Sequence, residues 1–419
     1  MRKKITAICI ACLLVIVLSG ITGCGGSSSN VQVNSGTEAG SSETGAEHTD
    51  SNNKDANISG GSIELENGKL SSDLTYSRST ETEYAEKFRI DRYMDAEGRE
   101  YTLLQTVPDD TLLLIVPEEG SIPKDLDASI VVLQRPVENL YLVASAAMDM
   151  FVELDALDSI RFSGQKQENW YIAEASQAMQ DGKILYAGKY SKPDYEMIVS
   201  NGCSLAIENT MIFHSPDVIE QLGNFGVPVV VDYSSTEDHP LGRVEWIKFY
   251  GALTGCEEAA LEIYEKEADM MEAVESGEKS NLTVAYFYIT SNNLVQVRKS
   301  SDYIPKMIEI AGGKYIFDNL TDDTNKSTVN MQLEEFYDKA KDSDVLIYNS
   351  SIDGGVESID ELIGKWELLK DFKAVKEGNV WCTTNDMYQQ SLSIGYMTED
   401  IHAILGGNEE GLHYIYKLQ

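Results

Sequence analysis

The spacing of apolar residues along the chain changes near Val137. Upstream, from Ser62 to about Val132, short apolar segments separated by turn residues predict strands. Downstream, unbroken apolar runs of strand length alternate with amphipathic helical stretches. The runs cover residues 140–144, 205–207, 227–231, 284–289, 345–348 and 380–382. Such runs between amphipathic helices are typical of parallel sheets covered by helices on both faces, so we expect an α/β fold.

The same pattern of helix and strand occurs twice. Glu196 opens a helical stretch that leads to a strand ending at Asn209, and Glu335 opens a stretch that leads to a strand ending at Asn349. In both places a hydroxyl residue follows the asparagine. Two halves built on one plan are the simplest interpretation.

A helix without breaks lies between these halves. Residues 256–276 contain neither Gly nor Pro, and their apolar side chains recur near helical spacing. They predict a rod of about 30 Å that ends before Gly277. We therefore expect two doubly wound, Rossmann-like α/β lobes, residues 136–255 and 280–419, joined by one long rigid α-helix. Residues 63–135 form a β-rich N-terminal extension of the first lobe. An ordinary surface helix within one domain is the alternative for residues 256–276.

The N-terminus has a pattern typical of export. Cations at residues 2–4 precede an apolar run at residues 5–18, which is shorter than the roughly 20 residues that a transmembrane helix needs. Residues 21–24, Ile-Thr-Gly-Cys, match a bacterial lipobox. We predict a signal peptide at residues 1–23 and lipid, such as palmitate, on Cys24. An ordinary signal anchor with a chance cysteine is the alternative.

The composition of the segment after the lipobox is typical of a flexible tether. Residues 24–62 are mainly Gly, Ser, Thr, Asn and acids, which predicts a disordered tether with a reach of about 30–40 Å. The protein would then be lipid-anchored at the extracellular face of the cell membrane. Its formal charge of −36, from 33 Lys and Arg against 69 Asp and Glu, argues against nucleic-acid partners and against adsorption to anionic lipid.

The cysteines after the lipobox are Cys203, Cys256 and Cys382. An odd, widely spaced set without a CxxC motif is neither a disulfide framework nor a zinc site. Buried free thiols are the favoured interpretation, and a single bridge is the alternative.

The sequence carries no GxSxG, HExxH or Walker A motif. Residues 312–314, Gly-Gly-Lys, are followed by Tyr315, where a phosphate loop would need Ser or Thr. His214 and His239 precede proline-containing turns and are interpreted as helix-entry residues rather than metal ligands. We therefore predict that the protein is not an enzyme and has no catalytic residue, metal site or cofactor.

Polar and aromatic residues follow the predicted strands. In doubly wound sheets, ligands bind outside the carboxyl ends of the strands. The candidate ligand-binding residues at these ends are Ser145, Asn209, Thr210, Tyr233, Ser234, Asn349 and Tyr388. Amide and hydroxyl groups among aromatic rings suit a cleft for a bulky, partly apolar ligand. The alternative is that the short polar side chains only cap the helices that follow.

Two further pairs are candidate ligand contacts. Trp170 and Tyr171 lie on a polar, loop-like stretch and suit a lid over the cleft, with core packing as the alternative. Arg298 and Lys299 are the most plausible cationic contacts for an anionic ligand. A solvated hairpin is the alternative for this second pair.

The layout of residues 136–405 resembles the substrate-binding lipoproteins of iron–siderophore, haem and cobalamin ABC importers, in which a rigid helix joins two lobes. The resemblance depends on six segments and their order: YLVAS at 141–145, KPDYE at 192–196, PLGRVEWIK at 240–248, GALTG at 251–255, MIEIAGG at 307–313 and VKEGNVW at 375–381. Residues 62–132 lie outside the shared pattern.

The resemblance implies a docking role for one acid in each lobe. In the family, an acidic residue at the head of a helix contacts arginines of the membrane permease, and the matching positions are Glu196 and Glu335. The neighbouring Glu334 is the alternative to Glu335 as the second docking acid. A favourable interaction with the helix dipole is the alternative for each acid. The Pro-Asp that usually precedes the next strand is replaced here by Cys203-Ser204 and by Ser343-Asp344.

The resulting functional hypothesis is a lipid-anchored extracellular solute-binding protein. It would capture a ferric siderophore and deliver it to an ABC permease and its ATPase, and we expect it to be a monomer. Haem or cobalamin is the alternative ligand, and Met211 with His214, or Met387, are candidate axial ligands of haem. A surface hydrolase or an adhesin without a transport role is the alternative class.

Overall fold

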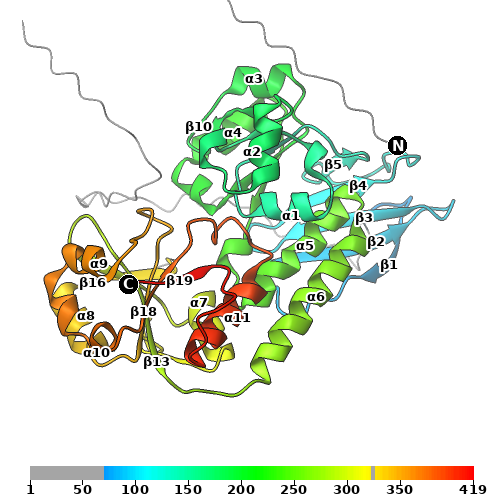
Figure 1. Ribbon diagram of the computed structural model, residues 1–419. Coiled ribbons are helices and arrows are strands. Elements are labelled where there is room, and N and C mark those ends of the chain that lie inside the picture. The colour runs from blue at the N-terminus through cyan, green and yellow to red at the C-terminus, as the bar shows by residue number, and fades with distance from the viewer. Residues whose placement is uncertain (1–69, 322–325) are drawn as a thin grey trace, which may run out of the picture. The chain divides into compact units, whose positions relative to one another are not determined.

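The computed structural model describes residues 70–321 and 326–419, which all belong to one unit of the chain (Figure 1). The predicted signal peptide, the lipidation at Cys24 and the tether at residues 24–62 lie outside the described residues. In the described residues, none of the helices has the length and apolar character needed to cross a bilayer.

The β-rich extension is a five-stranded sheet in which the strands follow one another in chain order. Its strands are β1 (Thr75–Ser79), β2 (Phe88–Met94), β3 (Glu100–Thr106), β4 (Thr111–Val116) and β5 (Val131–Gln134). Neighbouring strands are antiparallel except for β4 and β5, which are parallel. The prediction of short strands in this stretch of the chain is confirmed for residues 70–132.

The first α/β sheet is parallel throughout, in the order β12-β11-β6-β7-β8. Its strands are β6 (Leu140–Leu142), β7 (Ile160–Ser163), β8 (Leu185–Tyr186), β11 (Leu205–Asn209) and β12 (Val229–Asp232). Its helices are α1 (Ala147–Glu153), α2 (Ala173–Gln180), α3 (Tyr195–Ser200) and α4 (Pro216–Asn224), and a small hairpin of β9 (Gly188–Lys189) and β10 (Lys192–Pro193) precedes α3. The prediction of parallel strands is confirmed for this sheet.

Two long helices follow, α5 (Pro240–Thr254) and α6 (Glu257–Glu275), and they lie side by side (Figure 1). Gly255 separates them with a left-handed φ of 93° that favours glycine. Close packing also requires Gly251, where an added Cβ would lie 2.5 Å from the Cβ of Ala260. The predicted helix at residues 256–276 is therefore present as α6, but it is packed along α5 and α11 (Ile394–Leu405) rather than free.

The second α/β sheet is mixed, so the expectation of a parallel sheet is wrong here. Its strands are β13 (Thr283–Ile289), β14 (Leu294–Arg298), β15 (Lys314–Tyr315), β16 (Thr328–Gln332), β17 (Val345–Tyr348), β18 (Val380–Thr383) and β19 (Ile415–Lys417). β13, β17 and β18 are parallel neighbours, whereas β14, β16 and β19 run antiparallel to theirs. Residues 290–293 join β13 to β14, and this turn is too short for the crossover that parallel strands need.

The other helices of the second sheet are α7 (Tyr303–Ile310), α8 (Leu333–Ala340), α9 (Ile359–Lys365) and α10 (Lys373–Glu377). Short 3-10 helices lie at Leu157–Ser159, Gln167–Asn169, Thr210–His214, Ser234–Thr236 and Glu367–Asp371. Cys203 and Cys382 are buried, Cys256 is partly buried, and all three are free thiols.

Candidate ligand-binding site

The loops after seven of the strands carry most of the predicted site residues, and we call them the strand-end loops. They are residues 143–146, 164–172, 210–215, 233–239, 290–293, 349–358 and 384–393. The first four follow parallel strands of the first sheet, and the last three follow parallel strands of the second. Each group therefore lies at one edge of its sheet, where ligands of doubly wound folds bind.

Contacts through the loop at residues 384–393 join the two edges. The side-chain oxygen of Gln389 accepts a hydrogen bond from the N–H of Tyr171 at 2.8 Å, and its amide nitrogen donates to the carbonyl of Asn169 at 2.8 Å. The rings of Tyr171 and Tyr388 meet edge to face, with centroids 6.3 Å apart. Gln389 is completely buried, and the sequence gives no local signal for a lone glutamine in this role.

Two buried carboxylates hold the same loop and the start of α11. Asp149 of α1 accepts a hydrogen bond from the N–H of Leu392 at 2.9 Å, and Glu267 of α6 accepts one from the N–H of Gly395 at 3.2 Å. The hydroxyl of Ser391 donates to the carbonyl of Ala146 at 2.7 Å. Burial raises the pKa of Asp149 to about 6 and that of Glu267 to about 7. We call these two acids and their N–H donors the latch.

The polar residues at the ends of the parallel strands form hydrogen bonds within the protein. Asn209 accepts a hydrogen bond from the N–H of Met211 at 2.9 Å, and Asn349, which is buried, accepts from the N–H and the hydroxyl of Ser351. Both asparagines thus stabilise the turns after their strands. Ser234 is buried as well.

Trp170 does not form a lid. Its side chain is 6% exposed, and its indole N–H donates to the hydroxyl of Ser163 at 3.2 Å, so the core-packing alternative is correct. The neighbouring Tyr171 is 50% exposed and remains available for contact with a ligand.

The two cations predicted at the end of β14 are engaged within the protein. The guanidinium of Arg298 lies 3.4 Å from the carboxylate of Asp302 and above the ring of Tyr286. Lys299 is only 4% exposed. Both cations therefore have partners within the protein, and their role as contacts for an anionic ligand stays a prediction.

Arg243 of α5 provides a further contact between the two halves. Its guanidinium carbon lies 4.0 Å from the centre of the Tyr303 ring of α7, and it donates to the carbonyl of Ser235 at 2.6 Å. Asp232, at the end of β12, accepts hydrogen bonds from the N–H of Ser234 and the hydroxyl of Tyr250. Burial nevertheless raises the pKa of the Asp232 carboxyl.

The four histidines in the described part of the chain, His214, His239, His402 and His413, contact their neighbours within the fold. His239 caps α5 by accepting a hydrogen bond from the N–H of Leu241, as predicted, and His214 ends the 3-10 helix before α4. His402 contacts the carbonyl of Ala311, and His413 contacts Asp400. Over residues 70–321 and 326–419, no group of three or more His, Cys, Asp or Glu is placed to hold a metal ion.

The two predicted docking acids lie at helix starts. Glu196 is exposed in the first turn of α3, whose preceding residue Asp194 caps the helix by accepting from the N–H of Met197. Glu335 is exposed in the first turn of α8 and pairs with Lys339 at 2.9 Å. Glu334 is also exposed in that turn, so the structure keeps both acids of α8 as candidates.

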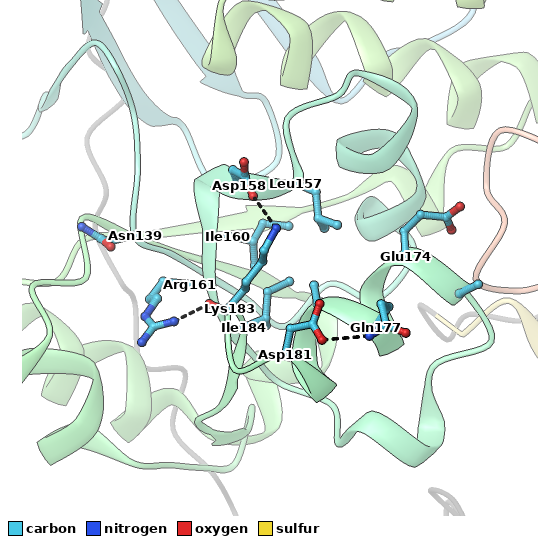
Figure 2. Close-up of a pocket in the computed structure, with 12 residues that line it drawn as sticks. Asn139, Leu157, Asp158, Ile160, Arg161, Glu174, Gln177, Asp181, Lys183 and Ile184 are labelled. Carbon is cyan, nitrogen blue, oxygen red and sulfur yellow. Dashed lines mark hydrogen bonds and ion pairs between the residues drawn. The ribbon is translucent and has the colours of Figure 1, made fainter. Parts of the chain in front are cut away.

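A surface cavity of about 440 Å³ lies at the opposite edge of the first sheet (Figure 2). Asn139, Ile160 and Ile184, which line it, lie at or just before the starts of their strands rather than at the ends. Its charged groups are matched locally: Figure 2 shows Lys183 facing Asp158 and Arg161 donating to the carbonyl of Lys183. Arg161 also donates to the carbonyl of Gly182. The predicted ligand-binding residues are not among its lining residues.

Comparison with solved structures defines the class of fold. The protein has the mixed α/β fold of the class III periplasmic binding proteins. It aligns with the periplasmic haem-binding protein HutB of Vibrio cholerae at a TM-score of 0.52 and 14% identity, covering 64% of this chain and 98% of that one. It also aligns with an ABC-type Fe³⁺-hydroxamate transport protein of Saccharomonospora viridis at 0.51 and 20% identity, covering 65% and 94%.

Two relatives in sequence are named as lipoproteins. The chain is 27% identical over 320 residues to an uncharacterized lipoprotein of Methanocaldococcus jannaschii, covering 73% of this chain and 72% of the relative. A second lipoprotein of that organism is 26% identical over 351 residues, covering 80% and 86%. No family model matches the chain. The resemblance in fold to the binding proteins of iron–siderophore and haem importers is thus confirmed, and identities this low establish the fold alone.

Proposed function

We propose that the protein is the lipid-anchored solute-binding component of an ABC importer and that it captures an iron chelate. The observation that carries the proposal is the meeting of the two sets of strand-end loops, where Gln389 links Asn169 and Tyr171 across them. Exposed tyrosine rings and short polar groups at this place suit a bulky ligand. Haem or cobalamin is the alternative ligand of the same site.

The proposed mechanism is closure of two α/β lobes that α6 joins. Because α6 is packed along α5 and α11, the movement would be small. Opening would separate Tyr171 from Gln389 and Ser391 from Ala146, and a bound ligand would replace part of those contacts. No bond of the ligand is broken, so the protein has no catalytic residues in this proposal.

Delivery would follow recognition of the closed form by the permease. Glu196 and Glu335 are the proposed docking acids, since each is exposed at the start of a helix in a different lobe. Arginines of the permease would pair with them. Lipid on Cys24 would keep the protein at the extracellular face of the membrane, near the permease and its ATPase.

Thermal unfolding of a soluble form beginning at Ser62 tests the proposal. The ligands are ferric hydroxamates, ferric catecholates, haemin and cobalamin, each added in excess. A ligand at about 100 times its Kd should stabilise the fold by about 2.7 kcal/mol, which is visible as a rise in Tm. If none of these ligands raises the Tm, the proposal fails and the adhesin or hydrolase class is favoured.

A further inference from the structure

The strand-end loops have an unusual balance of charge. Lys166 is the only Lys or Arg in them, and the structure describes all of these loops. Their acids are Glu168, Glu237, Asp238, Asp353, Glu357 and Asp386. A ligand that approaches these loops therefore meets a negative field, which the formal charge of −36 on the whole chain reinforces.

The cations nearest to the loops already have partners within the protein. Arg243 donates to the carbonyl of Ser235 and Lys87 to the carbonyl of Thr236, both in the loop at residues 233–239. Lys166 faces Glu168 at 3.8 Å, and Lys365 of α9 pairs with Asp353 at 2.7 Å. Arg298 pairs with Asp302, as described above. An anionic ligand would have to displace one of these partners to contact a cation, so the net electrostatic gain would be small.

Aromatic rings are the groups that these loops do expose. Tyr171 and Phe213 are each 50% exposed, and Tyr388 is 37% exposed. They follow β7, β11 and β18, so they come from both sheets. Ring faces carry negative charge density, and they bind apolar groups and cations while offering little to an anion.

We infer that the ligand is a metal chelate of zero or positive net charge, held by the rings of Tyr171, Phe213 and Tyr388. This inference rests on the function proposed above. Three hydroxamates neutralise Fe³⁺, and an ammonium tail makes such a complex cationic. Three catecholates leave it with a charge of −3, and the propionates make haemin anionic. Ferric hydroxamates therefore fit the strand-end loops, whereas ferric catecholates and haemin do not.

Calorimetric titration of the full-length protein in detergent tests the inference. The probes are ferrioxamine B (charge +1), ferrichrome (neutral), cyanocobalamin (neutral), ferric enterobactin (charge −3) and haemin. The expected result is that a neutral or cationic probe binds at least about tenfold more tightly than either anionic probe. Tighter binding of ferric enterobactin or haemin overturns this inference but supports the proposed function. Binding of none of the probes overturns both.

Variants test the part played by the rings. Tyr171→Ala and Tyr388→Ala should each weaken binding of the best probe at least about fivefold. The matched control is Tyr76→Ala, because Tyr76 is 49% exposed on β1, away from the strand-end loops, and its loss should leave the Kd unchanged. Unchanged binding in both loop variants, with folding confirmed by thermal melts, overturns the assignment of the rings.

Discussion

Two regions of the protein use buried carboxylates to hold backbone N–H groups, and they differ in the number of donors that each carboxylate receives. Where the β-rich extension meets α5, Glu245 is completely buried and accepts hydrogen bonds from the N–H groups of residues 83–85. It also pairs with Lys248 at 2.7 Å. In the latch, by contrast, Asp149 and Glu267 each hold one N–H.

The difference in the number of donors shows how a buried carboxylate is compensated in this fold. Several donors and a cation can compensate a carboxylate for the loss of water, whereas a single N–H does not. Burial therefore raises the pKa of both latch acids. Glu208 of β11 extends the series: it is completely buried, neither of its oxygens has a hydrogen-bond partner within the described residues, and burial raises its pKa to about 8.

Removal of the fully satisfied carboxylate should have the largest effect. Glu245→Ala leaves the N–H groups of residues 83–85 without an acceptor and Lys248 without its partner, so we expect a loss of about 3–5 kcal/mol in the free energy of unfolding. Urea denaturation measures it. The control is Glu309→Ala, whose exposed pair with Lys306 should contribute less than about 0.5 kcal/mol. Equal losses in the two variants would break the comparison.

Removing the charge of Glu208, the carboxyl group without hydrogen-bond donors, should raise the stability of the protein rather than lower it. Because its folded pKa is raised to about 8, Glu208 favours the native state only while it is protonated. Its contribution to stability therefore falls as the pH rises from about 4.5 to about 8. Glu208→Gln removes this ionisation and should make the protein more stable than the wild type at pH 9, by about 2–4 kcal/mol.

Denaturation of both proteins at pH 5 and pH 9 checks this prediction. The advantage of Glu208→Gln should shrink at pH 5, where the wild-type carboxyl is protonated in the folded state. If the variant is less stable than the wild type at both pH values, Glu208 has a hydrogen-bond partner, and its carboxyl group is not the uncompensated one of this comparison.

Local sequence pattern predicts the elements of this fold but not the contacts just compared. The strands at residues 205–207 and 345–348 and the helix α6 are continuous stretches whose burial depends on their own side chains, so periodicity reveals them. The antiparallel direction of β14 was not predicted, because a short turn reverses the chain after β13. Strand direction depends on that turn rather than on apolar spacing.

The site residues show the same limit. Tyr388 was proposed from its place after a strand and Tyr171 from its place in an aromatic pair, both of which are local features, and their contact with a ligand stays a prediction. Gln389 and Asp149 were missed, since their partners Tyr171 and Leu392 are 218 and 243 positions away in the sequence. Trp170 was misplaced for a related reason: whether an indole is buried depends on the neighbours that the fold brings to it.

A steric change sharpens the comparison at the latch. An added Cβ at Gly395 would lie 2.7 Å from a carboxylate oxygen of Glu267 and 2.8 Å from the sulfur of Met270, so Gly395→Ala should displace the acid and destabilise the fold by about 1–3 kcal/mol. The matched control is Gly364→Ala in α9, where a Cβ meets nothing within 4 Å. It should stabilise the protein by about 0.5–1 kcal/mol through helix propensity. If thermal melts show that both variants change the Tm in the same direction, close packing of Gly395 against Glu267 does not stabilise the latch.

An exposed carboxylate should give the smallest effect. Glu168 is 69% exposed and faces Lys166 at 3.8 Å in a strand-end loop. Because water already solvates both groups, Glu168→Gln should change the free energy of unfolding by less than about 0.5 kcal/mol. The same substitution frees Lys166, so affinity for ferric enterobactin should rise about two- to threefold at low salt, and the gain should disappear at 0.5 M NaCl. If the gain persists at high salt, Lys166 is not its source, and the charge of the strand-end loops does not select the ligand in the way inferred here.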